Sequence, residues 1–254
     1  MIKRVIVFLV ALGIFLSFPI LATKVEQTTT DATHILIGKV KKVDCYYGSN
    51  EWGDTLIYSR VEVSVMKKLK GKAEDLVSFV VEGGTVGEIT LKVSEYPLFT
   101  EGEKIKLYLK KTDHIFKFVR SEVLEEAPAS AKKPGGKPGA PTCCKTFAHW
   151  PYPYDVVYHI FPSSNDGLSD DCIVNEVNAS ADIWNSVSAI NMNYVAEGGV
   201  GNIEQNYSND IIFRPASSGS TIAVTYIWYS RKGKEIFEFD MLFYDGAWIF
   251  FSLI

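Results

Sequence analysis

Imidazole and thiolate side chains carry much of the chemistry of enzymes, and this chain has few of either. It contains four histidines and four cysteines. No two histidines lie four positions apart, and the zinc-binding pattern His-Glu-x-x-His does not occur. We therefore expect ordinary surface or core histidines rather than metal ligands. The four are His34, His114, His149 and His159.

Nucleophilic catalysis is equally hard to place in this sequence. The Gly-x-Ser-x-Gly pattern that exposes a nucleophilic serine in many hydrolases is absent. His149 is the only histidine close in sequence to a cysteine, because Cys143 and Cys144 lie just before it. A free catalytic thiol does not suit the oxidising compartment that the N-terminus predicts below.

Carboxylates are the remaining candidates for a site. Asp210 and Asp240 lie in two apolar runs that we expect to be strands, and they could provide hard oxygen ligands for calcium. The alternative is that the acidic groups cap a helix, favour solubility and cover a solvated strand face. The other acidic residues in these groups are Asp166, Asp170, Asp171, Glu235, Glu238 and Asp245.

The N-terminus predicts export from the cytoplasm. Lys3 and Arg4 precede an uncharged apolar run, residues 5–23, which contains the small Ala22 near its end. This is the pattern of a secretory signal covering residues 1–22, although the run is also just long enough for a retained N-terminal anchor. Both readings place the rest of the chain outside the cytoplasm, either secreted or anchored at the outer face of the membrane.

The composition favours a folded protein and argues against nucleic acid as a partner. Of the 254 residues, 47% are hydrophobic, which is enough to bury a core. Lys and Arg number 26 against 30 Asp and Glu, giving a net charge of −4. Because there is no basic excess to neutralise a phosphate backbone, we expect no nucleic-acid partner and membrane contact only through a retained N-terminal segment.

The four cysteines of an exported chain are expected to pair rather than to bind metal. Their spacing matches no zinc knuckle or ribbon. Adjacent cysteines rarely pair with each other, so the favoured disulfide joins Cys143 or Cys144 to Cys172, and free buried thiols are the alternative. Cys45 is the fourth cysteine.

A segment without large apolar residues divides the chain. Residues 125–142 hold four of the ten prolines together with several Gly and Lys residues, so this segment has nothing to bury and is predicted to be a linker. The predicted domains are therefore 24–124 and 143–254.

The first domain is predicted to be all-β. Six short runs with apolar alternation are separated by glycine-containing turns, which favours a small, partly open, OB-like barrel. The Gly83-Gly84 pair is interpreted as a turn, because no helix and no Lys-Ser/Thr follow it as a P-loop requires. The aromatic segment 46–52 is interpreted as a folded-over loop, with a contact surface as the alternative. The six runs are 34–43, 56–69, 76–81, 88–93, 104–110 and 114–119.

The second domain is predicted to be α/β. Ile173, Val177, Ala181, Trp184 and Val187 recur at helical spacing after a capping Ser169 or Asp170, which predicts a helix over 169–187. The remaining apolar runs give a strand before the helix and four strands after it. The expected strands are 156–161, 191–195, 210–213, 222–228 and 234–243.

This order of elements carries a family resemblance. The residues concerned are Trp150, the strand 157–160, the helix 175–184 ending in Ile183-Trp184-Asn185, the strand Asp210-Ile-Ile-Phe213, and 238–243 followed by Trp248. Over about 150–250 the chain resembles the N-terminal subdomain of a matrixin-like metalloprotease of the metzincin group. The resemblance implies peptide-bond hydrolysis with zinc, calcium as a second candidate metal, protein or peptide substrates, and an edge strand near 239–243.

The most specific element of that family is missing from the sequence. A helix carrying His-Glu-x-x-His-x-x-Gly-x-x-His would begin soon after Trp248, where the chain instead reads Phe250-Phe251-Ser-Leu-Ile254. None of the three zinc-binding imidazoles or the catalytic glutamate can be assigned. We therefore expect a truncated or frameshifted family member, or a naturally short relative, that binds no cofactor and is inactive as this chain.

Two further expectations follow from the sequence. The alternative function is a non-enzymatic exported binding protein that uses the β-barrel as its contact module. The absence of a covering helix would also leave an apolar patch near the C-terminus, through which the chain could self-associate. The patch would consist of Phe237, Phe239, Phe243, Trp248, Phe250 and Phe251.

Overall fold

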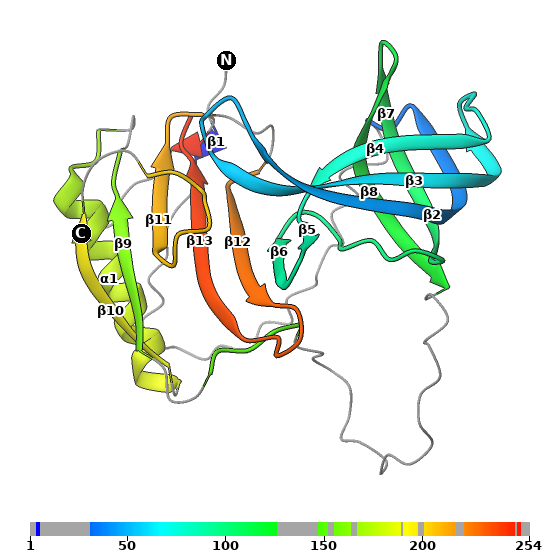
Figure 1. Ribbon diagram of the computed structural model, residues 1–254. Coiled ribbons are helices and arrows are strands. Elements are labelled where there is room, and N and C mark those ends of the chain that lie inside the picture. The colour runs from blue at the N-terminus through cyan, green and yellow to red at the C-terminus, as the bar shows by residue number, and fades with distance from the viewer. Residues whose placement is uncertain are drawn as a thin grey trace, which may run out of the picture.

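The computed structural model is built from two large β-sheets and one helix (Figure 1). It describes residues 4–5, 31–125, 147–151, 155–163, 167–188, 190–197, 201–216, 221–246 and 248–249. The expected signal or anchor and the expected linker therefore lie almost entirely outside the described residues, as do Cys143, Cys144 and Asp166. Among the described residues, no helix is both long and apolar enough to cross a bilayer. A short parallel pair joins β1 (Arg4–Val5) to β14 (Trp248–Ile249).

The first sheet is antiparallel and strongly curved. Its five strands lie in the order β4-β3-β2-β7-β8. The alternation of buried and exposed residues along β4 is that of a sheet with one face on a core and one toward solvent. The strands are β2 (His34–Ser49), β3 (Thr55–Lys70), β4 (Leu76–Glu82), β7 (Lys104–Thr112) and β8 (Ile115–Glu125).

The chain leaves this sheet after β4 because of two consecutive glycines. Gly83 and Gly84 both have positive φ, at 98° and 143°, which side chains rarely adopt. A Cβ on Gly84 would also collide with the side chains of Ser59 and Cys45. The expectation of a turn here is confirmed. The chain then forms the hairpin of β5 (Gly84–Val86) and β6 (Ile89–Val93), which joins the second sheet.

The second sheet has seven strands in the order β10-β9-β11-β13-β12-β6-β5. The four strands β10, β9, β11 and β13 run parallel to one another, whereas β12 is antiparallel to β13 and to β6. The strands from the second half are β9 (Asp155–Phe161), β10 (Asn191–Glu197), β11 (Asn209–Arg214), β12 (Ala223–Ser230) and β13 (Ile236–Tyr244).

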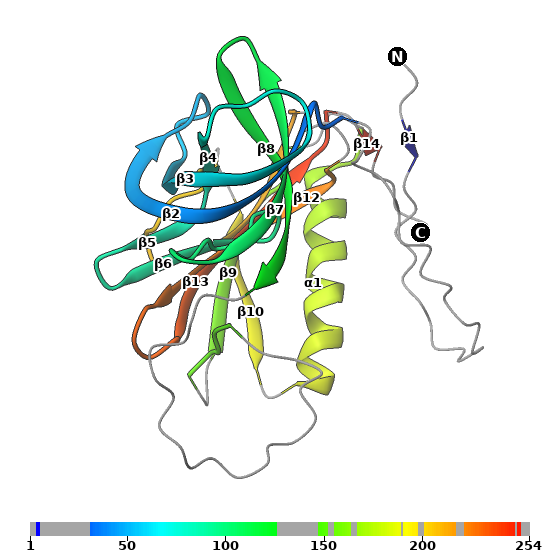
Figure 2. The same ribbon diagram turned by 90° about the vertical axis from the view of Figure 1, so that its right-hand side faces the viewer.

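One helix, α1 (Asp170–Val187), covers one face of this sheet (Figure 2). The prediction of a helix over 169–187 is confirmed, and Ser169 is its N-cap, accepting a hydrogen bond from the backbone of Cys172. Ile173 and Ala181 are buried as expected. The two C-terminal residues of the predicted apolar face are not buried, since Trp184 is 63% and Val187 73% exposed.

Trp184 and Val187 are exposed because a polar residue of the last helical turn, rather than these apolar ones, faces the sheet. Asn185 faces β10, where its amide donates to the carbonyl of Met192 and its oxygen accepts from the Met192 backbone nitrogen. Residues one and two positions away on the helix therefore point outward. The expectation that the whole apolar stripe is buried is wrong for its last turn.

Three apolar cores follow from this arrangement. One fills the curve of the five-stranded sheet, a second lies between α1 and the seven-stranded sheet, and a third lies on the other face of the seven-stranded sheet. The third core is shared by both halves of the chain. It packs Leu56 and Ile57 of β3 and Leu91 of β6 against Trp228 of β12 and Leu242 of β13.

The predicted β-rich character of the first part is confirmed, but the predicted small barrel is not. The described strands form no closed barrel, because β5 and β6 leave the first sheet and its edges β4 and β8 stay unjoined. The expected edge strand at 239–243 is also wrong, because β13 lies between β11 and β12. The pairing of β6 with β12 crosses the predicted linker, so the two predicted domains share one sheet.

Candidate functional sites

One face of β11 organises the polar groups that sequence reasoning singled out. Asp210, Ile212 and Arg214 alternate along this strand and therefore share a face of the sheet. Ile212 belongs to the core between the two halves. The acidic group lies at one end of this row and the basic group at the other, and each collects different partners.

At the C-terminal end of β11, Arg214 forms a buried ion pair with Asp54. Its two terminal nitrogens donate to the two carboxylate oxygens of Asp54, at 2.7 and 2.8 Å. The carboxylate also accepts from the backbone nitrogen of Ile203 at 2.9 Å and from the amide of Asn50 at 2.8 Å. Every contact is a charge-assisted hydrogen bond, and the bidentate geometry is the one that arginine favours.

The pairing decides the ionisation of both groups. Burial alone would raise the pKa of Asp54, but the hydrogen bonds from Arg214, Ile203 and Asn50 outweigh burial and lower it. Burial likewise opposes the charge of Arg214, but Asp54 raises its pKa above the usual value. Both side chains therefore stay charged inside the protein.

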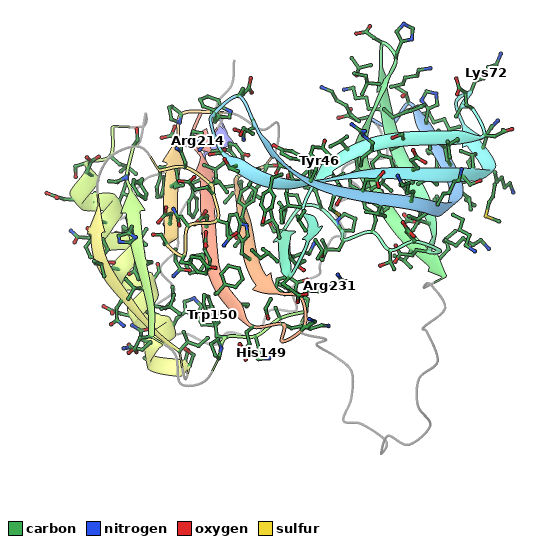
Figure 3. All side chains as sticks on the ribbon, viewed as in Figure 1. Tyr46, Lys72, His149, Trp150, Arg214 and Arg231 are labelled. Atoms are coloured by element: carbon green, nitrogen blue, oxygen red, sulfur yellow. The ribbon has the colours of Figure 1, made fainter. Side chains whose placement is uncertain are left out.

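The aromatic loop of the first half folds over this ion pair. The guanidinium of Arg214 lies 5.4 Å from the centre of the Trp52 ring, a cation–π contact. Asn50 holds the loop by accepting from the backbone nitrogens of Trp52 and Asp54. Figure 3 shows Arg214 on the seven-stranded sheet and Tyr46 on the long strand that reaches toward it. Residues 46–49 of this segment belong to β2, so the interpretation as a folded-over loop holds only for the residues that follow, and the contact surface stays a prediction.

At the other end of the same face, three carboxyl groups gather without a basic partner of this kind. Asp210 of β11 is in register with Asp240 of β13, and its backbone nitrogen donates to the Asp240 carboxylate at 3.1 Å. Glu238, two residues before Asp240, accepts from the backbone nitrogens of Asn206 and Tyr207. Glu238 and Asp240 are completely buried.

Burial without a counter-charge raises the pKa of two of these carboxyl groups, Asp240 and Glu238. Burial, reinforced by the charges of Asp210 and Glu238, raises the pKa of Asp240 to about 9. Burial also raises the pKa of Glu238 to about 7, although the backbone hydrogen bonds of Asn206 and Tyr207 oppose it. Asp240 is therefore neutral at pH 7, and its second oxygen has no hydrogen-bond partner among the described residues.

A histidine and a serine complete this carboxyl group cluster at its more exposed side. Ser208 Oγ donates to Asp210 at 2.7 Å and lies 2.8 Å from Nδ1 of His159. The same His159 nitrogen is 3.4 Å from Asp210. A catalytic triad needs the histidine to take the serine proton while the carboxylate holds its other nitrogen. Here the serine hydroxyl donates its hydrogen bond to the Asp210 carboxylate instead of to the histidine, so the cluster is not arranged as a nucleophile and base.

Sequence reasoning named Asp210 and Asp240 as possible calcium ligands and Glu238 as an acidic residue near Asp240, but it did not place His159 or Ser208 beside them. It treated His159 as isolated, and it gave Ser208 no role. The missing signal was strand register, because β9 and β11 pair so that His159 lies opposite Asp210. No group of three His, Cys, Asp or Glu side chains in the described part of the chain is placed to hold a metal ion. The calcium expectation gains no support from this geometry.

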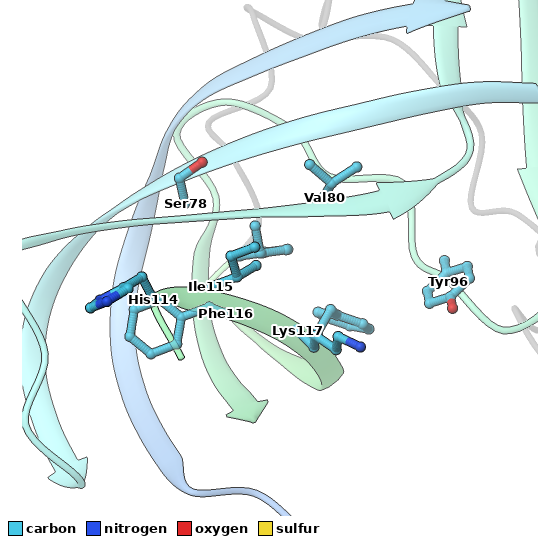
Figure 4. Close-up of a pocket in the computed structure, with 9 residues that line it drawn as sticks. Ser78, Val80, Tyr96, His114, Ile115, Phe116 and Lys117 are labelled. Atoms are coloured by element: carbon cyan, nitrogen blue, oxygen red, sulfur yellow. The ribbon is translucent and has the colours of Figure 1, made fainter. Parts of the chain in front are cut away.

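A groove opens in the seam between β4 and β8 of the five-stranded sheet (Figure 4). Its volume is about 530 Å³. The floor contains the aromatic rings of Phe79 and Phe118, which stack 5.6 Å apart between centroids. The groove is lined by Ser78, Phe79, Val80, Tyr96, His114, Ile115, Phe116, Lys117 and Phe118.

The other predicted residues are scattered. His34 contacts Phe116, His114 lines the groove, and His149 joins a bridge to Glu235, far from His159. Asp170 and Asp171 occupy the first turn of α1, as capping predicts, and Asp245 is buried. Cys45 and Cys172 are half-buried, and neither forms a disulfide with another described residue. The pairing with Cys143 or Cys144 stays a prediction, because neither of those is among the described residues.

The predicted C-terminal apolar patch is only partly described. Phe237, Phe239 and Phe243 are half-buried and pack against the apolar cores. The side chains of Trp248, Phe250 and Phe251 lie outside the described residues. Self-association stays a prediction.

In the described residues, the fold and these sites define a β-rich protein with one mixed sheet, one helix and two buried polar clusters. Comparisons with protein-family models, with curated proteins and with solved structures found no match to this chain. Function must therefore be inferred from the residues and their geometry.

Proposed function

We propose that this chain is an exported protein whose second half is built like the start of a matrixin-like zinc protease and which does not itself hydrolyse peptides. The observation that carries the proposal is the arrangement of the second half. A strand, a long helix and four further strands follow one another, and all five strands lie in one sheet with the helix on one face. The basic and apolar N-terminal residues support export.

The zinc that the resemblance implies does not fit the residues of this chain. Neither the sequence motif nor a suitable group of described side chains is present. The acidic cluster of Asp210, Glu238 and Asp240 is buried, and Glu238 and one oxygen of Asp240 already accept backbone hydrogen bonds. We therefore assign no hydrolytic step to this chain.

The proposal is tested by metal analysis and a general peptide-cleavage assay on the purified full chain. We expect the purified chain to contain less than one zinc ion per molecule. We also expect that it shows no chelator-sensitive peptide cleavage. His159→Ala is a matched variant, because it removes the one histidine beside a carboxylate cluster, and it should change neither readout. Stoichiometric zinc with chelator-sensitive cleavage would contradict the proposal.

The gene itself offers a second test of family membership. If the chain belongs to such a protease family, the nucleotide sequence shortly after codon 254 should encode His-Glu-x-x-His. An unrelated downstream sequence would favour the binding function below.

A second candidate function is binding through the five-stranded sheet, and the groove between β4 and β8 favours it. Apolar rings form its floor, and Val80 and Ile115 stand exposed at its sides. Ligand sites are typically concave and mostly apolar with a few polar groups, here His114 and Lys117. An apolar fluorescent probe should bind the full chain and lose affinity in Val80→Glu, while Val187→Glu on α1 should bind normally. Equal binding by both variants would contradict this function.

A further inference from the structure

Seven exposed lysines gather at one end of the five-stranded sheet, which we call the basic tip. They come from the end of β3, the turn after it, and the hairpin of β7 and β8. They are Lys67, Lys68, Lys70, Lys72, Lys110, Lys111 and Lys117. Only Lys68 is in an ion pair with an acidic side chain in the described part of the chain, with Asp75 at 3.0 Å.

Contacts through the start of β2 hold the two lysine groups together. Lys70 Nζ donates to the carbonyl of Ala32, and the backbone nitrogen of Lys111 donates to Thr33 Oγ1. His34 lies between them, with one ring nitrogen 3.0 Å from the carbonyl of Lys72 and its ring edge against Phe116. The tip is therefore a fixed surface of the fold.

Three large apolar side chains among these lysines are exposed to solvent. Met66 is 60%, Leu69 45% and Ile115 68% exposed. Lone exposed apolar residues are ordinary, but three beside seven lysines make a surface that is both basic and apolar. A soluble polyanion would use only the lysines. An anionic bilayer would use both, since lysines meet lipid headgroups while apolar side chains enter the interface.

The second half of the chain is negatively charged, and this charge would orient the basic tip toward an anionic bilayer. Residues 143–254 contain 5 Lys and Arg against 13 Asp and Glu, whereas residues 24–124 contain 16 against 15. Figure 3 shows Lys72 at the end of the molecule opposite the seven-stranded sheet. An anionic surface would repel the second half and attract the tip.

We propose that the basic tip docks the protein on an anionic lipid bilayer. This inference goes beyond the proposed function, and it differs from the expectation of membrane contact only through the N-terminal segment. It depends on the tip alone, so it stands whether or not the second half belongs to a protease family.

The test is co-sedimentation of the full chain with phosphatidylcholine vesicles, with and without phosphatidylglycerol. The apolar run 5–23 could bind either vesicle, so the readout is the gain in affinity caused by the anionic lipid. We expect a clear gain that high salt removes. The triple variant Lys67→Gln, Lys110→Gln, Lys117→Gln should lower that gain by roughly fivefold per lysine, or about a hundredfold. Equal binding to both vesicles by the unmodified chain would overturn the proposal.

Two controls separate the tip from general charge and from polyanion binding. Arg231→Gln, Lys232→Gln, Lys234→Gln makes the same change in net charge at the turn before β13 and should keep the full gain. Met66→Ser with Ile115→Ser should weaken vesicle binding but leave heparin binding unchanged. If this pair leaves vesicle binding unchanged, the tip binds polyanions and the bilayer proposal is wrong. Melting temperatures near that of the unmodified chain confirm that each variant is folded.

Discussion

Two buried polar clusters lie on the same face of the seven-stranded sheet, and they differ in whether their charges are paired. At one end of β11, Arg214 and Asp54 satisfy each other with two hydrogen bonds. At the other end, Asp210, Glu238 and Asp240 lie together, and burial raises the pKa of the last two. The first cluster joins the two halves of the chain, whereas the second belongs to the second half.

The difference shows how a protein buries acidic groups in two ways. A paired carboxylate keeps its charge, because the partner replaces the water that it has lost. An unpaired one keeps its proton instead. The two ways have opposite consequences for pH. The lowered pKa of Asp54 gives stability that is present above its ordinary pKa and lost as pH falls through the folded value. The raised pKa of Asp240 lowers stability as pH rises from about 4 to about 9.

The largest expected effect comes from breaking the paired cluster. Arg214→Ala leaves Asp54 buried and uncompensated, so the free energy of unfolding should fall by about 3–5 kcal/mol. Denaturant unfolding at neutral pH measures this change. Because Asp54 belongs to the first half and Arg214 to the second, the loss should appear in probes of both halves.

The matched control replaces both members of the pair by apolar residues of similar volume. Arg214→Met with Asp54→Leu leaves no buried charge alone, so the double variant should be more stable than Arg214→Ala. A double variant as unstable as the single one would show that the ion pair itself, rather than an orphaned charge, carries the effect.

The unpaired cluster should respond in the opposite direction. Asp240→Asn keeps an acceptor for the Asp210 backbone nitrogen and cannot lose a proton. At about pH 8 the variant should be more stable than the unmodified chain by about 1–3 kcal/mol, and at about pH 4 the two should be equal. Thermal unfolding across this pH range provides the measurement. If Asp240→Asn is destabilising at about pH 8, the carboxyl group is needed in its charged form and our account of its burial is wrong.

A smaller effect is expected at the exposed side of the same cluster. Ser208→Ala removes the hydrogen bond to Asp210 and should lower the free energy of unfolding by about 0.5–1.5 kcal/mol. Ser208→Thr keeps a hydroxyl and serves as the control. Any hydrolysis of activated esters by the unmodified chain that Ser208→Ala abolishes would show that this serine is a nucleophile after all.

The smallest effect should come from an exposed ion pair. Lys232 lies 3.2 Å from Glu88, and both side chains are mostly in solvent. Lys232→Ala should change the free energy of unfolding by less than about 0.5 kcal/mol. This small change in the free energy of unfolding is the reference value for an exposed ion pair, with which the loss in Arg214→Ala is compared. A loss comparable to that of Arg214→Ala would remove the distinction between buried and exposed pairs in this protein.

Local patterns in the sequence predicted the parts of the fold that depend on neighbouring residues. The spacing from Ile173 to Ala181 and the capping Ser169 were sufficient for α1. The Gly83-Gly84 turn was recognised, but its direction was not. Which sheet β6 joins depends on Leu91 packing against Trp228, a contact between residues far apart in sequence. Periodicity within β6 carries no information about that partner.

The same limit explains what was found and missed at the candidate sites. Asp210 and Asp240 were singled out because each is an acidic residue in an apolar run, but the parallel pairing that places them side by side was not predicted. Asp54 and Arg214 are 160 residues apart, and neither stands out from its surroundings. The exposure of Trp184 was missed because periodicity predicts an apolar face but not that the last turn meets β10 through the polar Asn185.

The central claim is that the two halves of the chain form one folded unit through β6, β12 and the Arg214–Asp54 pair. Differential scanning calorimetry of the full chain tests it most directly. We predict a single transition with equal calorimetric and van't Hoff enthalpies, which moves as a whole to lower temperature in Arg214→Ala. Two separate transitions, with only one of them shifted by the substitution, would contradict this account and restore the two independent domains on either side of residues 125–142.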